Sequence, residues 1–176
     1  MKKFLFIFII FLFLSSIVYA QDSVPSITYS TSFKDDIIMS PAYGFIWYFQ
    51  RGIEEVLRFT KFTPAMRVGY SLDLSDRRVG EMEMLTEKNN TDLIPTVEKI
   101  YETEIGKIEN DLNESFLSSI LGSSPLGLSP EVRTNVTQRL DNQINALSII
   151  SGKVPEPVKV DINNAIGKAK ECKNKV

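Results

Sequence analysis

The sequence predicts an all-α fold of about five helices, packed as antiparallel hairpins in a helical bundle. At three places a Ser-Pro or Thr-Pro pair directly precedes a stretch in which apolar residues recur every three or four positions. Ser and Thr side chains cap helices and Pro is tolerated in the first turn, so the cap and the periodicity agree. The expected connections are mostly short, which favours antiparallel packing of consecutive helices.

The first predicted helix starts at Ser40-Pro41 and runs to about Lys61. Its aromatic segment separates into two faces at about 100° per residue. We expect the apolar face to be a core stripe, made of Phe45, Ile46, Phe49, Ile53, Val56 and Leu57. Trp47 is expected on the opposite face, among Gln50, Arg51, Glu54 and Arg58, with Tyr48 at the boundary.

Four more helices follow in the same manner. The second begins at Thr63-Pro64 and stops at Asn89-Asn90. The third begins near Thr91, and a loop rich in serine and glycine is expected over 122–128. The fourth begins at Ser129-Pro130 and closes at Gly152, and the fifth begins at 155–157. Residues 40–176 are therefore predicted to form one helical domain.

Residues 1–20 have the features of a secretory signal peptide: a charged start, the apolar run 4–14, and Val18-Tyr19-Ala20 as a cleavage site. The alternative is a retained anchor, since residues 4–20 approach the length that spans a bilayer. Both interpretations predict a secreted or extracytoplasmic protein, and the second adds membrane attachment. Residues 21–39 are expected to be an extended or disordered arm.

The composition excludes several functional classes. The chain has no histidine and one cysteine, which excludes His-dependent nucleophile systems and zinc sites built on His or Cys clusters. It is mildly acidic without a basic block, so nucleic acid is not expected as a partner. No phosphate-binding loop or nucleophile elbow occurs. We expect no enzyme activity, no cofactor and no metal; a carboxylate hydrolase would require two acids facing each other across a cleft.

The remaining single residues suggest modifications. Cys172 is expected to be a free thiol on a fraying tail, or a cross-link between two copies. Candidate glycosylation sites lie in three Asn-x-Ser/Thr sequons, at Asn89, Asn113 and Asn135.

The densest charged motif is DRRVGEME at 76–83. On a helix, Arg77 and Arg78 lie four and three residues from Glu81, so each can form an ion pair with it. We interpret these as structural ion pairs on a solvated face. The alternatives are a ligand site and an arginine that reaches a neighbouring helix.

Trp47, Tyr48 and Arg51 are the candidate interaction residues. Trp47 is the sole tryptophan. It could stack on Arg51, be covered by the 21–39 arm, or anchor a partner.

Three segments together resemble an exported or membrane-tethered prokaryotic family, number fifty-six sixty-seven of the domain-of-unknown-function series. They are SPAYGFIWYFQRGIEEVLRFTKFTP at 40–64, LDLSDRRVGEMEML at 72–85 and ALSIISGKVPEPVKVDINNAIGKAKE at 146–171. The resemblance implies helical hairpins and an extracytoplasmic location, but no activity. The chain lacks a lysine that often follows Tyr43 in the family, and has Gln143 near where a histidine is common.

The leading hypothesis is a non-enzymatic, exported interaction or structural module of the cell envelope, which binds another protein or its own copies. The alternative is an extracytoplasmic chaperone or envelope-stress sensor that binds unfolded protein. The alternative would need an exposed apolar or methionine-rich face. Met66, Met82 and Met84 share one helix, but Met82 belongs to its core stripe.

Overall fold

The computed structural model describes residues 44–120 and 128–176, and this part of the chain is helical with no strand. Five α-helices and one short 3-10 helix are present within it. They are α2 (Phe45–Arg58), α3 (Pro64–Glu87), η3 (Thr91–Leu93), α4 (Ile94–Ile120), α5 (Pro130–Ser151) and α6 (Glu156–Lys173). The predicted all-α class is confirmed.

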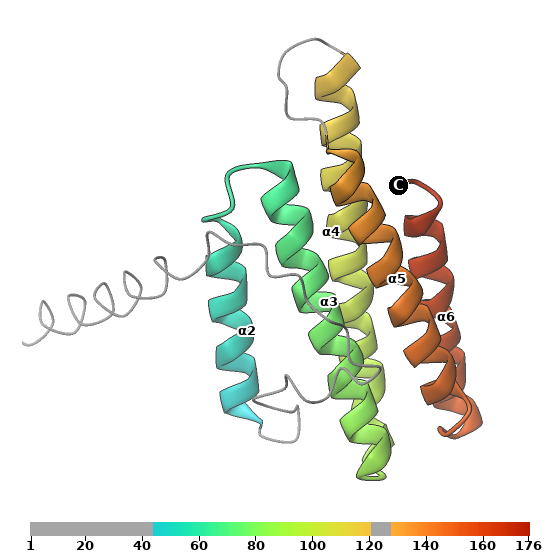
Figure 1. The fold of residues 1–176 in the computed structure, drawn as a ribbon. Coiled ribbons are helices and arrows are strands. Elements are labelled where there is room, and N and C mark those ends of the chain that lie inside the picture. The colour runs from blue at the N-terminus through green and yellow to red at the C-terminus, as the bar shows by residue number, and fades with distance from the viewer. Residues whose placement is uncertain (1–43, 121–127) are drawn as a thin grey trace, which may run out of the picture.

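The helices α3, α4, α5 and α6 form a bundle, with α3 beside α4 and α5, and α6 beside α4 and α5 (Figure 1). The core lies between these four helices and consists of fully buried aliphatic side chains together with Tyr101. Representative members are Val68, Leu72, Val79, Val97, Ile105, Leu140, Leu147 and Ile162. Each of these helices buries its apolar stripe against its neighbours, and the removal of this apolar surface from water stabilises the bundle.

The predicted helix starts and stops are largely confirmed. The Thr63 hydroxyl accepts a hydrogen bond from Met66 N, and the Ser129 hydroxyl accepts one from Val132 N. Helix α3 ends just before Asn89, whose φ of 54° turns the chain out of the helix. Gly152 is the C-cap of α5, although its φ of −72° is right-handed, so glycine is not required there for its backbone conformation.

Helix α2 lies at the edge of the bundle beside α3 (Figure 1). It begins at Phe45, after Gly44, whose φ of 56° is a conformation that favours glycine. The helix therefore starts later than Ser40-Pro41, a signal that lies outside the described residues. The predicted signal peptide, the 21–39 arm and most of the 122–128 loop lie outside them as well.

The prediction of a core stripe on α2 is wrong, because the helix faces the bundle with its polar side. Five members of the stripe, Phe45, Ile46, Phe49, Ile53 and Val56, are 41–82% exposed and the sixth, Leu57, is half-buried. In contrast, Trp47 and Glu54 are 1% and 3% exposed. The two faces of α2 have the predicted composition, but the solvent-facing and bundle-facing sides are exchanged. The physical reason is a set of buried ion pairs that replaces the usual apolar contact.

Candidate functional site

Glu54 is the centre of the contact between α2 and α3. Its carboxylate accepts hydrogen bonds from Arg78 Nη2 at 2.8 and 2.9 Å, and from Arg77 Nη1 at 2.7 Å. Within α2, Arg51 Nη1 donates to it at 2.6 Å and Gln50 Nε2 at 3.2 Å. A carboxylate with this many charge-assisted hydrogen bonds can be buried because its lone pairs are satisfied.

Glu81 is the second buried carboxylate of this contact. Arg78 Nη1 donates to both of its oxygens, at 2.8 and 2.9 Å, and Trp47 Nε1 donates to Oε1 at 3.2 Å. The Arg78 guanidinium thus bridges Glu81 of its own helix and Glu54 of α2. It also lies 6.0 Å from the centre of the Trp47 ring, within range of a cation–π contact.

Burial sets the protonation behaviour of these groups. It raises the pKa of Glu81 to about 7, although the charge of Arg78 and the hydrogen bond from Trp47 act in the opposite direction. Burial likewise lowers the pKa of Arg78, against the attraction of Glu81 and Glu54. The buried Arg78 Nε has no hydrogen-bond partner within the part of the chain that the structure describes. Arg78 is the member on which the network depends most, because its removal would leave two buried carboxylates without their shared partner.

A second set of ion pairs attaches α2 to α4. Arg58 Nη2 and Arg67 Nε each lie 2.7 Å from one oxygen of Asp111, and Arg58 also donates to the Ser71 hydroxyl. Lys107 of α4 lies 2.6 Å from Glu55. The C-terminal half of α2 is therefore held against α4 by charged side chains.

This orientation leaves an apolar surface on the other side of α2. We call it the outer face of α2 and define it by residues whose side chains, or Cα for glycine, are exposed: Phe45, Ile46, Tyr48, Phe49, Gly52, Ile53, Val56 and Phe59. Among the exposed residues of α2 itself, Glu55 is the one charged residue. Phe62 and Met66 continue the apolar surface beyond the helix, at 84% and 48% exposure.

Isolated apolar side chains on a surface need no explanation, but a contiguous apolar patch does. At about 150–250 Å² per aromatic side chain, the exposed fractions of Phe45, Tyr48, Phe49, Phe59 and Phe62 add up to on the order of 700 Å². That exceeds the patch found on most monomeric soluble proteins and is typical of an interaction site. The outer face of α2 is therefore the candidate functional site.

The three candidate interaction residues are divided between the two sides of α2. Tyr48 lies on the outer face and is 63% exposed. Trp47 is buried and contacts Arg78 and Glu81, so its side chain is not the exposed anchor considered for it, and the 21–39 arm that could cover it lies outside the described residues. Arg51 is bound to Glu54 at 2.6 Å and lies 3.6 Å from Glu104 of α4.

The predicted ion pairs are confirmed in part. Arg78 pairs with Glu81 as expected, whereas Arg77 pairs with Glu54 of α2. Arg78 and Glu81 have 1% and 0% exposed side chains, so the expectation of a solvated face is wrong for this pair. Both arginines reach the neighbouring helix, as one of the alternatives proposed.

A separate buried network connects α3, α4 and α5 around Gln143. The Tyr101 hydroxyl donates to Gln143 Oε1 at 2.9 Å, and Gln143 Nε2 donates to Ser75 Oγ at 2.8 Å and Asp76 Oδ1 at 2.5 Å. Arg139 Nε donates to Asp76 at 2.9 Å. Burial raises the pKa of Asp76 against the effect of Arg139. Gln143 thus fills its position as a fully satisfied structural residue.

A pair of acids lies where α4 meets α6. Burial, the charge of Glu102 and a hydrogen bond with Glu102 raise the pKa of Glu98 to about 8, and the nearby Asp161 adds to the effect. Glu98 is only 7% exposed. The arrangement favours a protonated carboxyl at neutral pH and makes this contact sensitive to pH.

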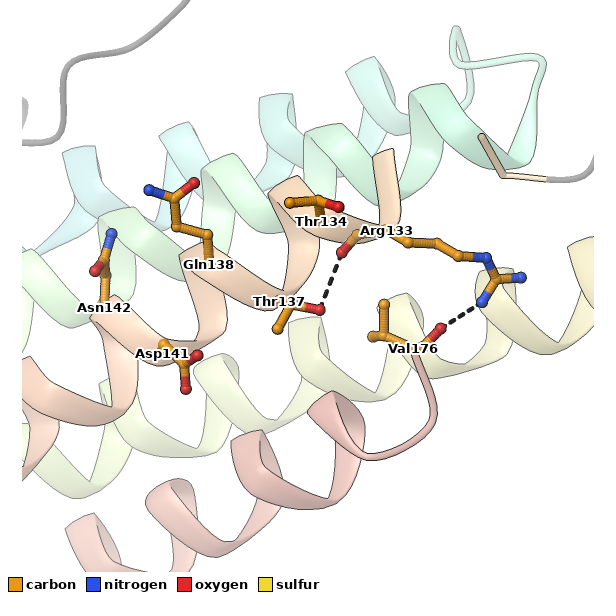
Figure 2. Close-up of a pocket in the computed structure, with 7 residues that line it drawn as sticks. All are labelled: Arg133, Thr134, Thr137, Gln138, Asp141, Asn142 and Val176. Atoms are coloured by element: carbon orange, nitrogen blue, oxygen red, sulfur yellow. Dashed lines mark hydrogen bonds between the residues drawn. The ribbon is translucent and has the colours of Figure 1, made fainter. Parts of the chain in front are cut away.

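A surface depression lies on α5 beside Val176. It is lined by side chains of α5 and by Val176 (Figure 2). Arg133 donates to the Val176 carbonyl oxygen and Thr137 donates to the Arg133 carbonyl oxygen. The first hydrogen bond holds Val176 against α5, the second lies within α5, and the polar groups do not converge on a common point (Figure 2).

Further single residues can be placed. Within residues 44–120 and 128–176 no three Asp, Glu or Cys side chains are grouped to hold a metal ion. Cys172 is fully buried in α6, so the expectation that it lies on a fraying tail is wrong. Burial, and to a smaller extent the negative charge of Glu109, raises the pKa of its thiol to about 12. The sequon residues Asn89, Asn113 and Asn135 are all exposed. None of the described helices is long and apolar enough to cross a membrane.

The fold and site define a class: a small bundle of four helices to which an amphipathic helix is attached by its charged side. Residues 45–157 match the family model described as Domain of unknown function (DUF5667), and the chain belongs to this family. The match includes α2, α3, α4 and α5 and ends at the start of α6, so it is shorter than the range 40–171 that the resembling segments span. Neither curated proteins nor solved structures give a match to this chain.

Proposed function

We propose that this chain is a non-enzymatic interaction module of the cell envelope that binds protein through the outer face of α2. The observation that carries the proposal is the inverted orientation of this helix. The charged residues of α2 are used in ion pairs with α3 and α4, while Phe45, Phe49 and Val56 point to solvent at 82%, 61% and 55% exposure. Apolar surface of this kind is stabilised when a partner removes it from water.

The surface has the composition of an interface core. Such cores are enriched in aromatic residues and depleted of charge, with charges at the rim. The outer face of α2 contains Phe and Tyr side chains, and Glu55 at its edge is already bound to Lys107 at 2.6 Å. A partner would therefore not have to desolvate an unpaired charge.

Site-specific photo-crosslinking tests the binding surface. A photoreactive phenylalanine analogue replaces Phe49 in the full chain in cells, and the same analogue replaces Val160, an exposed apolar residue of α6, as a control. We expect protein adducts from position 49 and at least tenfold fewer from position 160. Lipid adducts alone, or no adduct, from position 49 would contradict binding of protein at this face.

Export is part of the proposal and rests on the sequence of residues 1–20. The mass of the protein isolated from an extracytoplasmic fraction should correspond to a chain that begins at Gln21, or to a membrane-bound chain that retains residues 1–20. The same mass measurement detects glycans on Asn89, Asn113 or Asn135. A full-length chain that remains in the cytoplasm would refute this part.

A second candidate is a chaperone or envelope-stress sensor that binds unfolded protein. The observation that favours it is the same exposed aromatic surface, extended by Phe62 and Met66, since apolar segments of unfolded chains could contact it. The chain would then suppress aggregation of a model client, and Phe49→Glu would abolish the effect. Unchanged client aggregation would remove this candidate.

A further inference from the structure

We propose that the partner at the outer face of α2 is the same face of a second copy of this chain, in a twofold-symmetric contact centred on Gly52. The inference rests on the proposed function, because it needs the outer face of α2 to be the binding surface. It adds the identity of the partner and the geometry of the contact.

The first step is the spacing along the middle of the face. Phe45, Phe49, Gly52, Val56 and Phe59 follow one another at intervals of four, three, four and three residues. This is the heptad spacing by which one helix packs along another at a shallow angle. The row spans about 21 Å at 1.5 Å per residue.

The second step is the symmetry of this row about Gly52. Two residues lie on each side, with Phe45 and Phe59 at the ends and Phe49 and Val56 next to the centre. A twofold contact requires a surface that complements itself. A row with a small centre and large apolar residues on both sides meets this requirement.

The third step is the presence of glycine at the centre. Among residues 44–120 and 128–176, nothing lies within 4 Å of a Cβ added at Gly52, so the packing of the described helices does not require glycine there. In the interior of an exposed helix, glycine costs about 1 kcal/mol relative to alanine. Close approach of a second helix backbone would explain why a residue without a side chain occupies the middle of the face.

The fourth step is the size of the surface. A stable protein interface buries about 800 Å² on each partner. The exposed aromatic area, on the order of 700 Å² before the aliphatic side chains are counted, is close to that value. Two copies would thus cover each other's apolar surface without a further protein.

Disulfide trapping in cells that express the full chain with Gly52→Cys tests the contact. The native Cys172 is fully buried and serves as the background, and Val160→Cys provides an exposed control on α6. After mild oxidation we expect a disulfide-linked dimer from Gly52→Cys, at least tenfold more abundant than from Val160→Cys. Cysteines at the centre of the contact can come within the 4.4–6.8 Å between Cα atoms that a disulfide requires. Equal yields would overturn the proposal.

The substitution Gly52→Leu separates a helix partner from a membrane. It adds apolar surface, so docking to a phosphatidylcholine vesicle would be unchanged or stronger, whereas a close crossing of two helices would be blocked. For the full chain in mild detergent, we expect the dimer dissociation constant from sedimentation equilibrium to rise at least tenfold. Because position 52 is exposed and a Cβ there meets nothing within 4 Å among the described residues, the thermal stability of the monomer should not fall. An unchanged dissociation constant would overturn the proposal.

The photo-crosslinking at Phe49 distinguishes failure of this inference from failure of the proposed function. Adducts with the mass of two copies support the second copy as the partner. Adducts with a different protein, combined with equal disulfide yields, overturn the second copy while the interaction function stands. Adducts to lipid or to residues 1–43 of the same chain overturn both.

Discussion

The indole Nε1 of Trp47 donates a hydrogen bond to the buried carboxylate of Glu81, 3.2 Å away on the neighbouring helix. This contact, together with the Arg78 guanidinium beside it, holds the polar side of α2 against α3. As a consequence, the apolar side of a strongly amphipathic helix faces outward. The proposed binding surface is thus produced by an ion-pair network beneath it.

The first prediction concerns Trp47 itself. Its side chain is 1% exposed, so its fluorescence should be shifted to shorter wavelength than in the unfolded chain and should be protected from acrylamide. Steady-state quenching of the folded chain checks this without any substitution, because Trp47 is the sole tryptophan. Quenching as strong as in urea would show that α2 does not bury this residue.

The second prediction concerns the arginines of α3. Arg78→Met should lower the free energy of unfolding by about 3–5 kcal/mol, because it leaves Glu54 and Glu81 buried without their shared partner. Arg77→Met is the matched control one residue earlier. The Arg77 side chain is 33% exposed, so we expect a loss of about 1 kcal/mol or less. Urea unfolding followed by circular dichroism measures both, and equal losses would contradict a special role of Arg78.

The third prediction concerns Gln143. Gln143→Leu removes the hydrogen-bond partner of the Tyr101 hydroxyl and of Asp76, and should lower the free energy of unfolding by about 1–3 kcal/mol. Gln138→Leu is the control, on an exposed position of the same helix, and should change it by about 0.5 kcal/mol or less. If thermal unfolding of the two variants coincides, the buried network does not contribute as described.

The fourth prediction is a dependence of stability on pH through Glu98. Its folded-state pKa of about 8 lies above the ordinary 4.5, so the folded chain holds this proton more tightly than the unfolded chain does. The contribution to stability is present in full below pH 4.5 and is lost as the pH rises through about 8. With allowance for solvent screening, we expect Glu98→Gln to be about 1–2 kcal/mol more stable than the parent at pH 9.

The control for the pH experiment is Glu131→Gln, an exposed acid in the first turn of α5. Its stability should follow that of the parent chain across the whole range. A constant difference between Glu98→Gln and the parent from pH 4 to pH 9 would refute the assignment of the titration to Glu98.

The bundle could be predicted from the sequence because its helix caps and apolar stripes are each specified by residues close together in the chain. Thr63 and Ser129 are caps that act within one turn, and the apolar stripes of α3 to α6 face the core as their spacing suggests. Only one side of each of these helices is apolar, so there is one favourable way to pack it.

The orientation of α2 could not be predicted in this way. Its apolar face is as regular as any other in the chain, and the usual inference that such a face is buried fails here. The deciding contacts join residues far apart in the sequence, such as Glu54 with Arg78 and Arg58 with Asp111. The sequence contains one indication of this orientation. Trp47 shares a face of α2 with charged residues, and the DRRVGEME segment of α3 carries residues of opposite charge that can pair with them.

The central claim is that α2 docks on α3 by its charged side, and a double-mutant cycle of Glu54→Gln and Arg78→Met tests it most directly. The two residues lie 2.8 Å apart and are almost fully buried, so the effects of the single substitutions on the free energy of unfolding should not add. We expect a coupling energy of about 2 kcal/mol or more. A coupling within about 0.5 kcal/mol of zero would mean that Glu54 faces solvent and would contradict the orientation of α2.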